Sequence, residues 1–355
     1  MDEYKIDSHK LMYHIDRVSD WLKGKPIYPI YMEISPIGSC NHRCIYCGLD
    51  FMKYQPRSLE LGVLKKRLRE MSKLGVKSIM YAGEGEPFIH RDMAEITKVT
   101  KKAGIDVAFT TNGVLLNKET ADKVLPYASW FKISINAGTP RTYAKIHRCR
   151  QDDFARVFDN IAYANKLRKK MGYSCTLGMQ LILLPDNSRE VELLAKKARD
   201  IGMDYLVVKP YSQHPQSKTR IFKDIRYEKY YNMAEKLRKY NSKDFNVVFR
   251  INTMQKWDKG WRNYKHCLAL PFWAYIDSDG NVWACSIYLS RKKFSIGNIY
   301  KDTFKKIWAG RKRLELHNWA AESLDTSKCR VNCRMDEVNR YLWELRNPQA
   351  HVNFI

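Results

Sequence analysis

The chain has 355 residues, and 45% of them are aliphatic or aromatic, which is typical of a globular protein with one main domain and a smaller one. No apolar run approaches the roughly 18 residues of a membrane-spanning helix, and the N-terminus lacks the apolar segment of a signal peptide. The 63 basic and 38 acidic residues give a net charge of +25, which fits an anionic small molecule, an acidic protein partner, a nucleic acid or a solvated basic surface.

Short β-branched or aromatic runs alternate with amphipathic helical stretches, which is the pattern of repeated βα units and a parallel sheet. We predict strands at 31–35, 77–82, 106–110, 130–136, 175–183 and 204–209, and helices between them at 59–73, 92–102, 140–147, 154–171 and 189–201. Gly75, Gly104 and Gly202 follow helices, where a left-handed residue is common. Six such units predict an α/β fold with a partial (β/α)6 TIM-like barrel at 30–225, after an N-terminal extension at 1–29.

Three cysteines follow the first predicted strand at the spacing CxxxCxxC: Cys40, Cys44 and Cys47. Such a loop can bring three thiolates to three corners of a [4Fe–4S] cluster, whereas ordinary clusters use four cysteines. The fourth iron would then be open to another ligand. Ligands of parallel barrels bind at the carboxyl ends of the strands, where this loop lies. A zinc loop is the alternative, since short cysteine spacings also bind zinc.

The cysteine spacing, with the aromatic Tyr46 before the last cysteine, resembles the radical S-adenosylmethionine (SAM) superfamily. The resemblance implies that SAM occupies the open iron, with Tyr46 among the residues that contact the cofactor. SAM is then cleaved to a 5′-deoxyadenosyl radical that abstracts hydrogen. Two later segments also resemble motifs of this family: Gly83-Glu84-Gly85-Glu86-Pro87 and Thr111-Asn112-Gly113. The first would accept hydrogen bonds from the SAM ammonium group, through Glu86 and backbone carbonyls, and the second would shape the floor of the site. Ordinary turns are the alternative for both.

Alternation along the fourth predicted strand places Lys132, Ser134 and Asn136 on one face and apolar residues on the other. A polar face on a central barrel strand must line a lumen that holds something polar, because unpaired buried polar groups are costly. In the resembling family, positions like Ser134 and Asn136 contact the SAM ribose.

The same alternation points Glu33, Gln180 and Lys209 into the lumen from three other strands. We expect Gln180 and Lys209 to contact the cofactor and Lys132 to contact the substrate. Pairing among these charged residues is the alternative.

Four cysteines remain in the C-terminal region: Cys267, Cys285, Cys329 and Cys333. Asp279-Gly280 between apolar runs predicts a hairpin that brings Cys267 and Cys285 together. The hairpin, a helix at 303–308 and the cysteines resemble the SPASM/twitch extension of radical SAM enzymes, which implies an auxiliary [4Fe–4S] cluster. Full SPASM domains have more cysteines, so this number favours one cluster and the shorter twitch form. Zinc held by four thiolates is the alternative.

We place this α+β cluster domain at 259–335, after a linker helix at 226–258 and before a C-terminal helix and tail at 336–355. Some radical SAM epimerases and lyases return a hydrogen atom from a free thiol. We expect this catalytic role for Cys149, with a small apolar filler as the alternative. Gln213 and His214 lie in the loop after the sixth predicted strand, and we predict that they contact substrate rather than form a solvated turn.

The resemblance runs from about residue 31 to residue 333, but a shared fold does not name the substrate. The basic charge and the inward lysines favour an anionic small molecule, and we expect a sugar or nucleotide-sugar that is oxidised or epimerised. A flavodoxin- or ferredoxin-like protein would be the reductant.

Peptide modification is an alternative within the family. We expect it to be disfavoured, because the 39 residues before Cys40 are too few for the leader-recognition domain of many such relatives. A zinc-stabilised RNA-binding protein is an alternative from another class. It is disfavoured because lysines and arginines are spread along the chain without a nucleic-acid module. Cysteines at ligand spacing without an export signal predict a cytoplasmic protein, with reduced thiols and no membrane partner.

Overall fold

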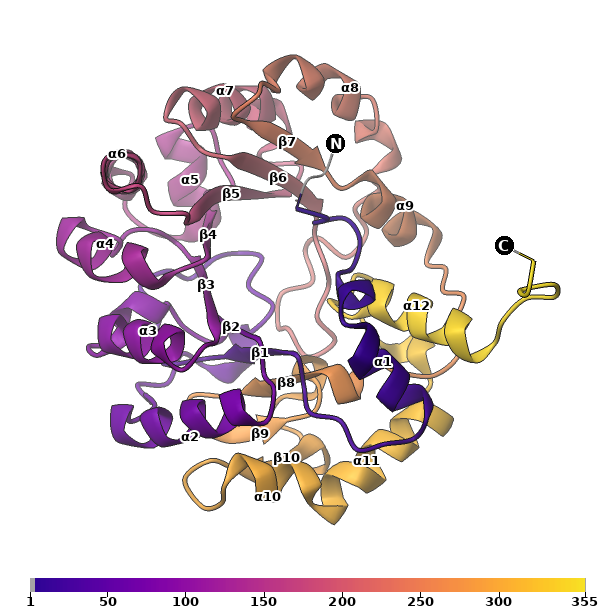
Figure 1. The fold of residues 1–355 in the computed structure, drawn as a ribbon. Coiled ribbons are helices and arrows are strands. Elements are labelled where there is room, and N and C mark those ends of the chain that lie inside the picture. Colours follow the sequence, from indigo (N-terminus) through magenta and orange to yellow (C-terminus); the bar gives the residue numbers. More distant parts are fainter. Residues whose placement is uncertain (1–3, 355) are drawn as a thin grey trace.

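The computed structural model describes residues 4–354, and its strands form one ten-stranded sheet in the order β10-β9-β8-β1-β2-β3-β4-β5-β6-β7 (Figure 1). The strands are β1 (Tyr31–Ile34), β2 (Ser78–Tyr81), β3 (Asp106–Thr111), β4 (Trp130–Ser134), β5 (Thr176–Leu183), β6 (Tyr205–Pro210), β7 (Asn246–Phe249), β8 (Trp273–Ile276), β9 (Asn281–Trp283) and β10 (Ser295–Asn298). Neighbours from β8 to β7 are parallel, and β9 and β10 are antiparallel additions. Figure 1 shows the sheet curving around a central axis, and we call its concave side the lumen.

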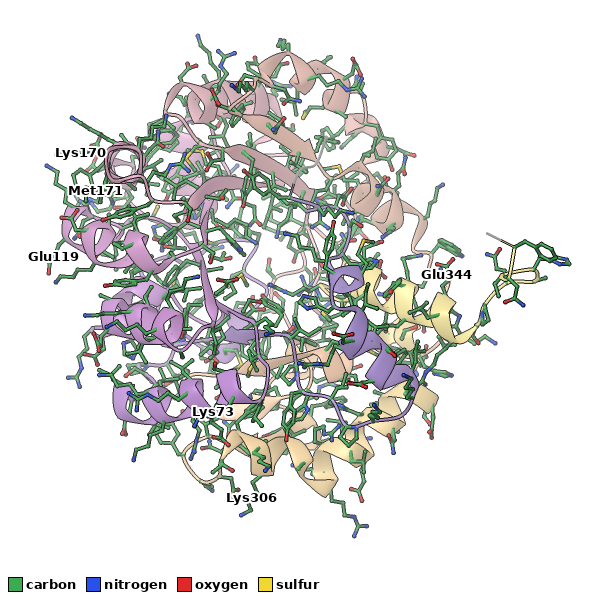
Figure 2. The ribbon with its side chains drawn as sticks, in the orientation of Figure 1. Lys73, Glu119, Lys170, Met171, Lys306 and Glu344 are labelled. Carbon is green, nitrogen blue, oxygen red and sulfur yellow. The ribbon has the colours of Figure 1, made fainter. Side chains whose placement is uncertain are left out.

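Helices cover the convex side of the sheet, as expected for βα units (Figure 1). The helices are α1 (Ile15–Leu22), α2 (Leu61–Lys73), α3 (Met93–Lys102), α4 (Lys118–Val124), α5 (Pro140–His147), α6 (Asp152–Met171), α7 (Val191–Asp200), α8 (Met233–Leu237), α9 (Ile251–Lys259), α10 (Phe304–Ala309), α11 (Arg311–Glu322) and α12 (Asp336–Arg346). Apolar faces such as Leu64, Leu68 and Met71 of α2 are fully buried. Figure 2 shows Lys73, Lys170 and Lys306 projecting outward from the helices, so part of the basic excess lies on the outer surface.

The six predicted strands and the five predicted helices between them are all present, with ends that differ by at most two residues. Alternation along β4 is confirmed, since Phe131 and Ile133 are buried against the helices whereas Lys132 and Ser134 are half-buried on the lumen side. Gly75, Gly104 and Gly202 have positive φ angles of 91°, 85° and 84°. Hydrophobic period and helix-ending glycines therefore predicted the barrel elements correctly.

The sheet extends beyond the six predicted strands on both sides. Strand β7 pairs in parallel with β6, Asn246 opposite Tyr205, inside the segment where we expected a linker helix. Segment 226–258, for which we expected a linker helix, contains α8, β7, α9 and short 3-10 turns. On the other side β8 pairs in parallel with β1, so the hairpin of the C-terminal region continues the barrel sheet. The domain boundaries stay predictions.

The N-terminal segment lies against the lumen side of β6 and β7, as the indigo trace in Figure 1 shows. The ring of Tyr4 lies 5.3 Å from the ring of Tyr205, and Asp7 pairs with Arg250 at 3.0 Å. Residues 4–7 therefore occupy part of the concave side of the sheet.

The C-terminal region contains the predicted hairpin and the predicted helices. Gly280, with φ of 79°, turns the chain between β8 and β9, and the Thr303 side chain caps α10 by accepting from the Lys306 amide at 3.1 Å. Helix α12 lies beside α1, where Arg346 stacks 4.4 Å from the Trp21 ring. Among residues 4–354, no helix combines the length and apolar character needed to cross a bilayer.

Candidate metal centre

The loop that carries Cys40, Cys44 and Cys47 follows β1 and is held against the end of α5. The backbone amides of Arg43 and Ile45 donate to the carbonyls of His147 and Ile146 at 3.1 and 2.9 Å. The amide of Cys47 donates to the carbonyl of Cys44 at 3.1 Å, which closes a tight turn. The structure therefore places the three predicted thiols together at the carboxyl end of the sheet.

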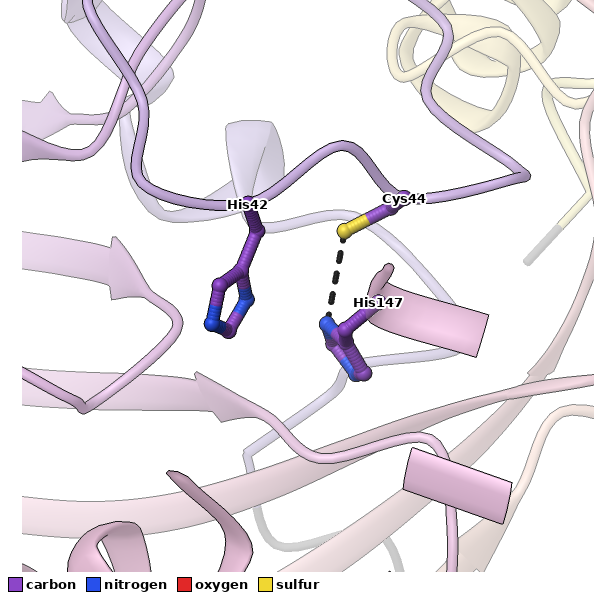
Figure 3. A group of neighbouring side chains, drawn as sticks. All are labelled: His42, Cys44 and His147. Atoms are coloured by element: carbon purple, nitrogen blue, oxygen red, sulfur yellow. Dashed lines mark hydrogen bonds between the residues drawn. The ribbon is translucent and has the colours of Figure 1, made fainter. Parts of the chain in front are cut away.

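His147 lies beside Cys44 of this loop, and no sequence motif indicated this position (Figure 3). Its Nδ1 is 3.3 Å from Sγ of Cys44, and its Nε2 donates to the carbonyl of Ile135 at 2.8 Å. Burial, and then the nearby His42, lower the pKa of His147 to about 3. The imidazole of His147 is therefore neutral where it contacts the cysteine loop.

The thiols of the loop have raised pKa values, partly because they lie close to one another, and they therefore deprotonate less readily than free thiols. Burial, followed by the charge of Glu86, raises the pKa of Cys40 to about 12, and burial followed by Cys47 raises that of Cys44. Metal binding requires deprotonated thiols, and a strongly cationic group would supply the charge that stabilises them as thiolates. These cysteines fit such a group.

The spacing of the thiols fits a cluster better than a single zinc ion. Tetrahedral zinc with Zn–S bonds of about 2.3 Å holds its sulfurs only about 3.8 Å apart. Among residues 4–354, the groups of three His, Cys or acidic ligand atoms within 4.8 Å of one another are His42–Cys44–His147 and His42–Cys149–Asp153. Neither group is made of the thiols alone. Both cysteine sets are therefore more widely spaced than one ion needs.

Gly83–Pro87 packs against the cysteine loop because two of its glycines have no side chain. A Cβ on Gly85 would collide with the carbonyl oxygen of Ser39, and one on Gly83, whose φ is 117°, would collide with the Tyr275 hydroxyl. The amide of Glu86 donates to the carbonyl of Ser39 at 2.9 Å. Close approach of the second motif to the cluster loop thus requires glycine at these positions.

Glu86 joins the second motif to the third. Its buried carboxylate accepts from Thr111 Oγ1 at 2.6 Å and from the Asn112 amide at 2.8 Å, and burial raises its pKa to about 7. The Asn112 side chain donates to Asn41 Oδ1, in the cysteine loop, at 2.6 Å. The three motifs therefore form one hydrogen-bonded unit. Contact of Glu86, Pro87, Thr111 and Asn112 with SAM stays a prediction.

Glu84 has a structural role that its sequence position did not indicate. It is 3% exposed, accepts from the amide and hydroxyl of Ser278 at 3.2 and 2.9 Å, and lies 3.5 Å from Arg57. Burial, followed by the charge of Asp277, raises its pKa to about 7. Glu84 therefore fastens the hairpin turn between β8 and β9 to the second motif.

Asn136 and Tyr46, both predicted to contact the cofactor, contact each other. The Asn136 amide donates to the Tyr46 hydroxyl at 2.6 Å, and Asn136 Oδ1 accepts from the Ile182 amide at 2.7 Å. Asn136 is fully buried, with φ of 56°. Its side chain thus ties β5 to the cysteine loop, whereas Ser134 stands opposite Gln180 on the lumen side.

The lumen contains the predicted charged residues and two arginines that the sequence analysis missed. Glu33 pairs with Arg334 at 3.1 Å and not with Lys132 or Lys209, so its partner is a residue that was not predicted. Burial, followed by Arg334, lowers the pKa of Lys132 to about 7, and burial followed by Lys132 lowers that of Lys209 well below its usual value. Among residues 4–354 neither lysine forms an ion pair.

The structure places Cys149 and His214 beside groups from outside the lumen. Cys149 Sγ lies within 4.8 Å of ligand atoms of His42 and Asp153, and burial, followed by Asp153, raises its pKa to about 12. His214 is 1% exposed and stacks on Phe51 at 5.0 Å. Gln213 donates to the carbonyl of Thr219 at 3.1 Å and lines a pocket of about 480 Å³.

The four C-terminal cysteines also lie together. Burial, followed by Cys333, raises the pKa of Cys267 to about 12, and the same two causes raise the pKa of Cys285 well above its usual value. Arg262 supports the turn that bears Cys329 by donating to the carbonyls of Thr326 and Arg330, both at 2.6 Å. These residues fit a second group that needs thiolates.

Comparison with known proteins agrees with this arrangement. The sequence model of the radical SAM superfamily matches residues 34–198, and that of the SPASM iron–sulfur cluster-binding domain matches residues 267–334. A GTP 3′,8-cyclase of Limosilactobacillus fermentum is 34% identical over 148 residues, which cover 39% of this chain and 43% of the relative. The subtilosin biosynthesis protein AlbA of Bacillus subtilis is 24% identical over 294 residues, covering 79% of this chain and 59% of AlbA.

A solved structure shares the fold. Streptococcus suis SuiB bound to S-adenosylmethionine has a TM-score of 0.67 and 19% identity, covering 92% of this chain and 76% of SuiB. The chain spans less than half the length of the cyclase relative and about 59% of AlbA. It belongs to the radical SAM superfamily and has a C-terminal SPASM domain, and the cofactors of these domains are [4Fe–4S] clusters and SAM.

Proposed function

We propose that this enzyme abstracts hydrogen from an unactivated carbon of an anionic small molecule held in the lumen. The observation that carries the proposal is that Lys132 and Lys209 lie on the lumen side of β4 and β6 and form no ion pair among residues 4–354. A nucleotide-sugar is our first candidate because it combines negative charge with carbons that only a radical can attack. None of the relatives described above is named for a sugar, so this choice rests on charge.

The residues of the chain would serve the reaction by holding and shielding the reactants. When bound, the cluster and SAM supply a 5′-deoxyadenosyl radical. Cys40, Cys44 and Cys47 would hold the iron, and the unit of Glu86, Asn112 and Asn41 would fix the loop that carries them. Ser134 and Gln180 would line the site on its lumen side.

Oxidation fits the placement of the remaining groups better than epimerisation does. Epimerisation needs a hydrogen donor near the substrate, but the neighbours of Cys149 are His42 and Asp153, from the cysteine loop and α6. Oxidation needs an electron acceptor, which Cys267, Cys285, Cys329 and Cys333 would hold. With four cysteines we propose one auxiliary cluster, as in the twitch form. We expect a flavodoxin- or ferredoxin-like reductant and a cytoplasmic location.

Peptide modification is the second candidate, and one observation favours it. The relative AlbA, named for subtilosin biosynthesis, matches 79% of this chain, which is more than either domain alone. The cyclase relative matches only 39% of the chain.

The test is anaerobic incubation of the reduced, cluster-loaded enzyme and SAM with nucleotide-sugars, nucleotides and acidic peptides. We expect 5′-deoxyadenosine to rise with a nucleotide-sugar, with deuterium transferred from the labelled substrate carbon. A response to peptides alone would replace the proposed substrate class. Zinc without sulfide in the purified protein would remove radical chemistry altogether.

A further inference from the structure

Positive charge exceeds negative charge on the lumen side of the sheet. The basic residues that influence one another there are Lys132, Lys209, Arg250, Arg330 and Arg334. Lys132 comes from β4, Lys209 from β6 and Arg250 from the residue after β7, whereas Arg330 and Arg334 each directly follow a cysteine of the C-terminal set. The fold thus gathers cations from segments that are distant in the sequence.

The acidic residues near this cluster are already paired. Glu33 lies 3.1 Å from Arg334, which also donates to the Tyr31 hydroxyl at 2.6 Å. Asp7 lies 3.0 Å from Arg250. Among residues 4–354, Lys132, Lys209 and Arg330 form no ion pair of their own, although the charge of Glu33 also acts on Lys132 and Arg330.

The remaining cations have neutral neighbours. Arg330 donates through Nε to the Ser212 hydroxyl at 2.9 Å, and the Lys132 ammonium lies 5.6 Å from the Trp130 ring centroid. Within residues 4–354, the Lys209 side chain has no hydrogen bond or ion pair, whereas its backbone belongs to the β5–β6 ladder. Cations enclosed together without counter-charge are unfavourable, because each loses hydration and repels the others. The lowered pKa values of both lysines reflect the free-energy cost of keeping them charged there, and a bound anion would offset that cost.

There is access for such an anion. Lys132, Lys209 and Arg330 are half-buried rather than sealed, and the Arg334 side chain keeps 42% of its surface accessible. Arg330 also lines the pocket of about 480 Å³ next to Cys329, together with Arg220 and Arg226. Positive charge therefore continues from this pocket to Arg330.

We propose that Lys132, Lys209 and Arg330 bind a phosphate or diphosphate group of the substrate. A carboxylate brings one negative charge, whereas phosphoryl groups bring two or more and match a set of unpaired cations better. The identification of this group as part of the substrate rests on the proposed function, but the anion site itself does not.

The test measures binding of inorganic pyrophosphate to the cluster-loaded full chain by calorimetry, in the presence of saturating SAM. We expect Lys132→Met/Lys209→Met to weaken pyrophosphate binding at least tenfold. The control Lys196→Met/Lys243→Met removes the same charge from exposed positions and should change binding less than twofold. Iron content and the spectral response to SAM show that each variant is folded.

Three results would overturn the inference. They are equal binding by both double variants, loss of pyrophosphate binding when SAM is added, and lysine-dependent binding of hexaglutamate in place of pyrophosphate. Binding needs no turnover. An enzyme that binds pyrophosphate but forms no 5′-deoxyadenosine with any substrate would therefore contradict the proposed function and leave this site standing.

Discussion

Gly85 shows how a single missing side chain shapes the centre. The carbonyls of Ser39 and Ile37 pass so close to its Cα that any Cβ would meet them. Backbone cannot yield as a flexible side chain can, so the cysteine loop and the second motif would be forced apart.

We therefore predict that Gly85→Ala lowers stability by about 1–3 kcal/mol and weakens iron binding at the first cysteine set. Gly62 is the matched control, because a Cβ there meets nothing within 4 Å. Thermal melts and iron content after anaerobic reconstitution measure the two effects. Equal iron content in Gly85→Ala and Gly62→Ala would contradict this account.

Glu84 gives stability a pH dependence in the metal-free chain. Its pKa rises from 4.5 to about 7 on folding, so the folded state holds the proton more tightly than the unfolded state. Stability therefore falls as pH rises between these values, by as much as roughly 3 kcal/mol.

We predict that Glu84→Gln flattens this fall, because glutamine keeps an acceptor for Ser278 but does not titrate. Exposed Glu344→Gln is the control and should leave the slope unchanged. Denaturant unfolding at pH 5, 6 and 7 provides the measurement. An unchanged slope in Glu84→Gln would assign the dependence to other groups.

At the scale of elements, the turn before Cys329 depends on Arg262. This side chain is 9% exposed and is surrounded by backbone carbonyls that have few other donors. Lysine cannot reproduce its planar fork, so Arg262→Lys leaves acceptors unpaired at about 1–3 kcal/mol.

We predict that Arg262→Lys loses iron from the C-terminal cysteines but keeps the spectral response to SAM. Arg311→Lys, at a position with 90% exposure, should retain all iron. Iron per chain and electron paramagnetic resonance with SAM separate the two sites. Loss of the SAM response together with iron would mean that the sites do not load independently.

The elements that could be predicted are those with a clear period or a glycine stop. Alternation revealed β4, and the Asp-Gly turn revealed the β8–β9 hairpin. Strand β7 is only four residues long and follows short helical turns, so its alternation of apolar and polar residues is too short to be recognised. Helix α4 is short and mostly polar, and it is stabilised by an Asn117 cap more than by an apolar face.

The motifs of the site could also be predicted, but their partners could not. Cysteine spacing and glycine-rich turns are local signals. His147 reaches the centre from the end of a helix with no recognisable motif. Arg330 and Arg334 follow the predicted ligands Cys329 and Cys333, but nothing in that segment indicates that they reach the lumen of the barrel. Only the topology brings them there.

At the scale of the whole molecule, the two cysteine regions share one sheet. Strand β8 pairs with β1 over Tyr31–Ile34, and all four residues of β8 are buried. The barrel therefore has no free edge at β1, and its first strand depends on the C-terminal region.

We predict that residues 1–260 alone aggregate, because β1 and its neighbours lose their cover. Residues 1–346, which lack only the tail after α12, should fold like the full chain. Gel filtration and far-ultraviolet circular dichroism distinguish the outcomes. A folded monomer of residues 1–260 would show that the barrel is independent.

The segment 329–334 contributes Cys329 and Cys333 to the second cysteine set and also Arg330 and Arg334 to the lumen. In a chain without iron at the second cysteine set, these two arginines would not be held in the positions that bind the substrate. Substrate binding would therefore depend on metal loading at the second cysteine set. Molecules without that metal would not start the reaction, and they would not release radicals in the absence of substrate.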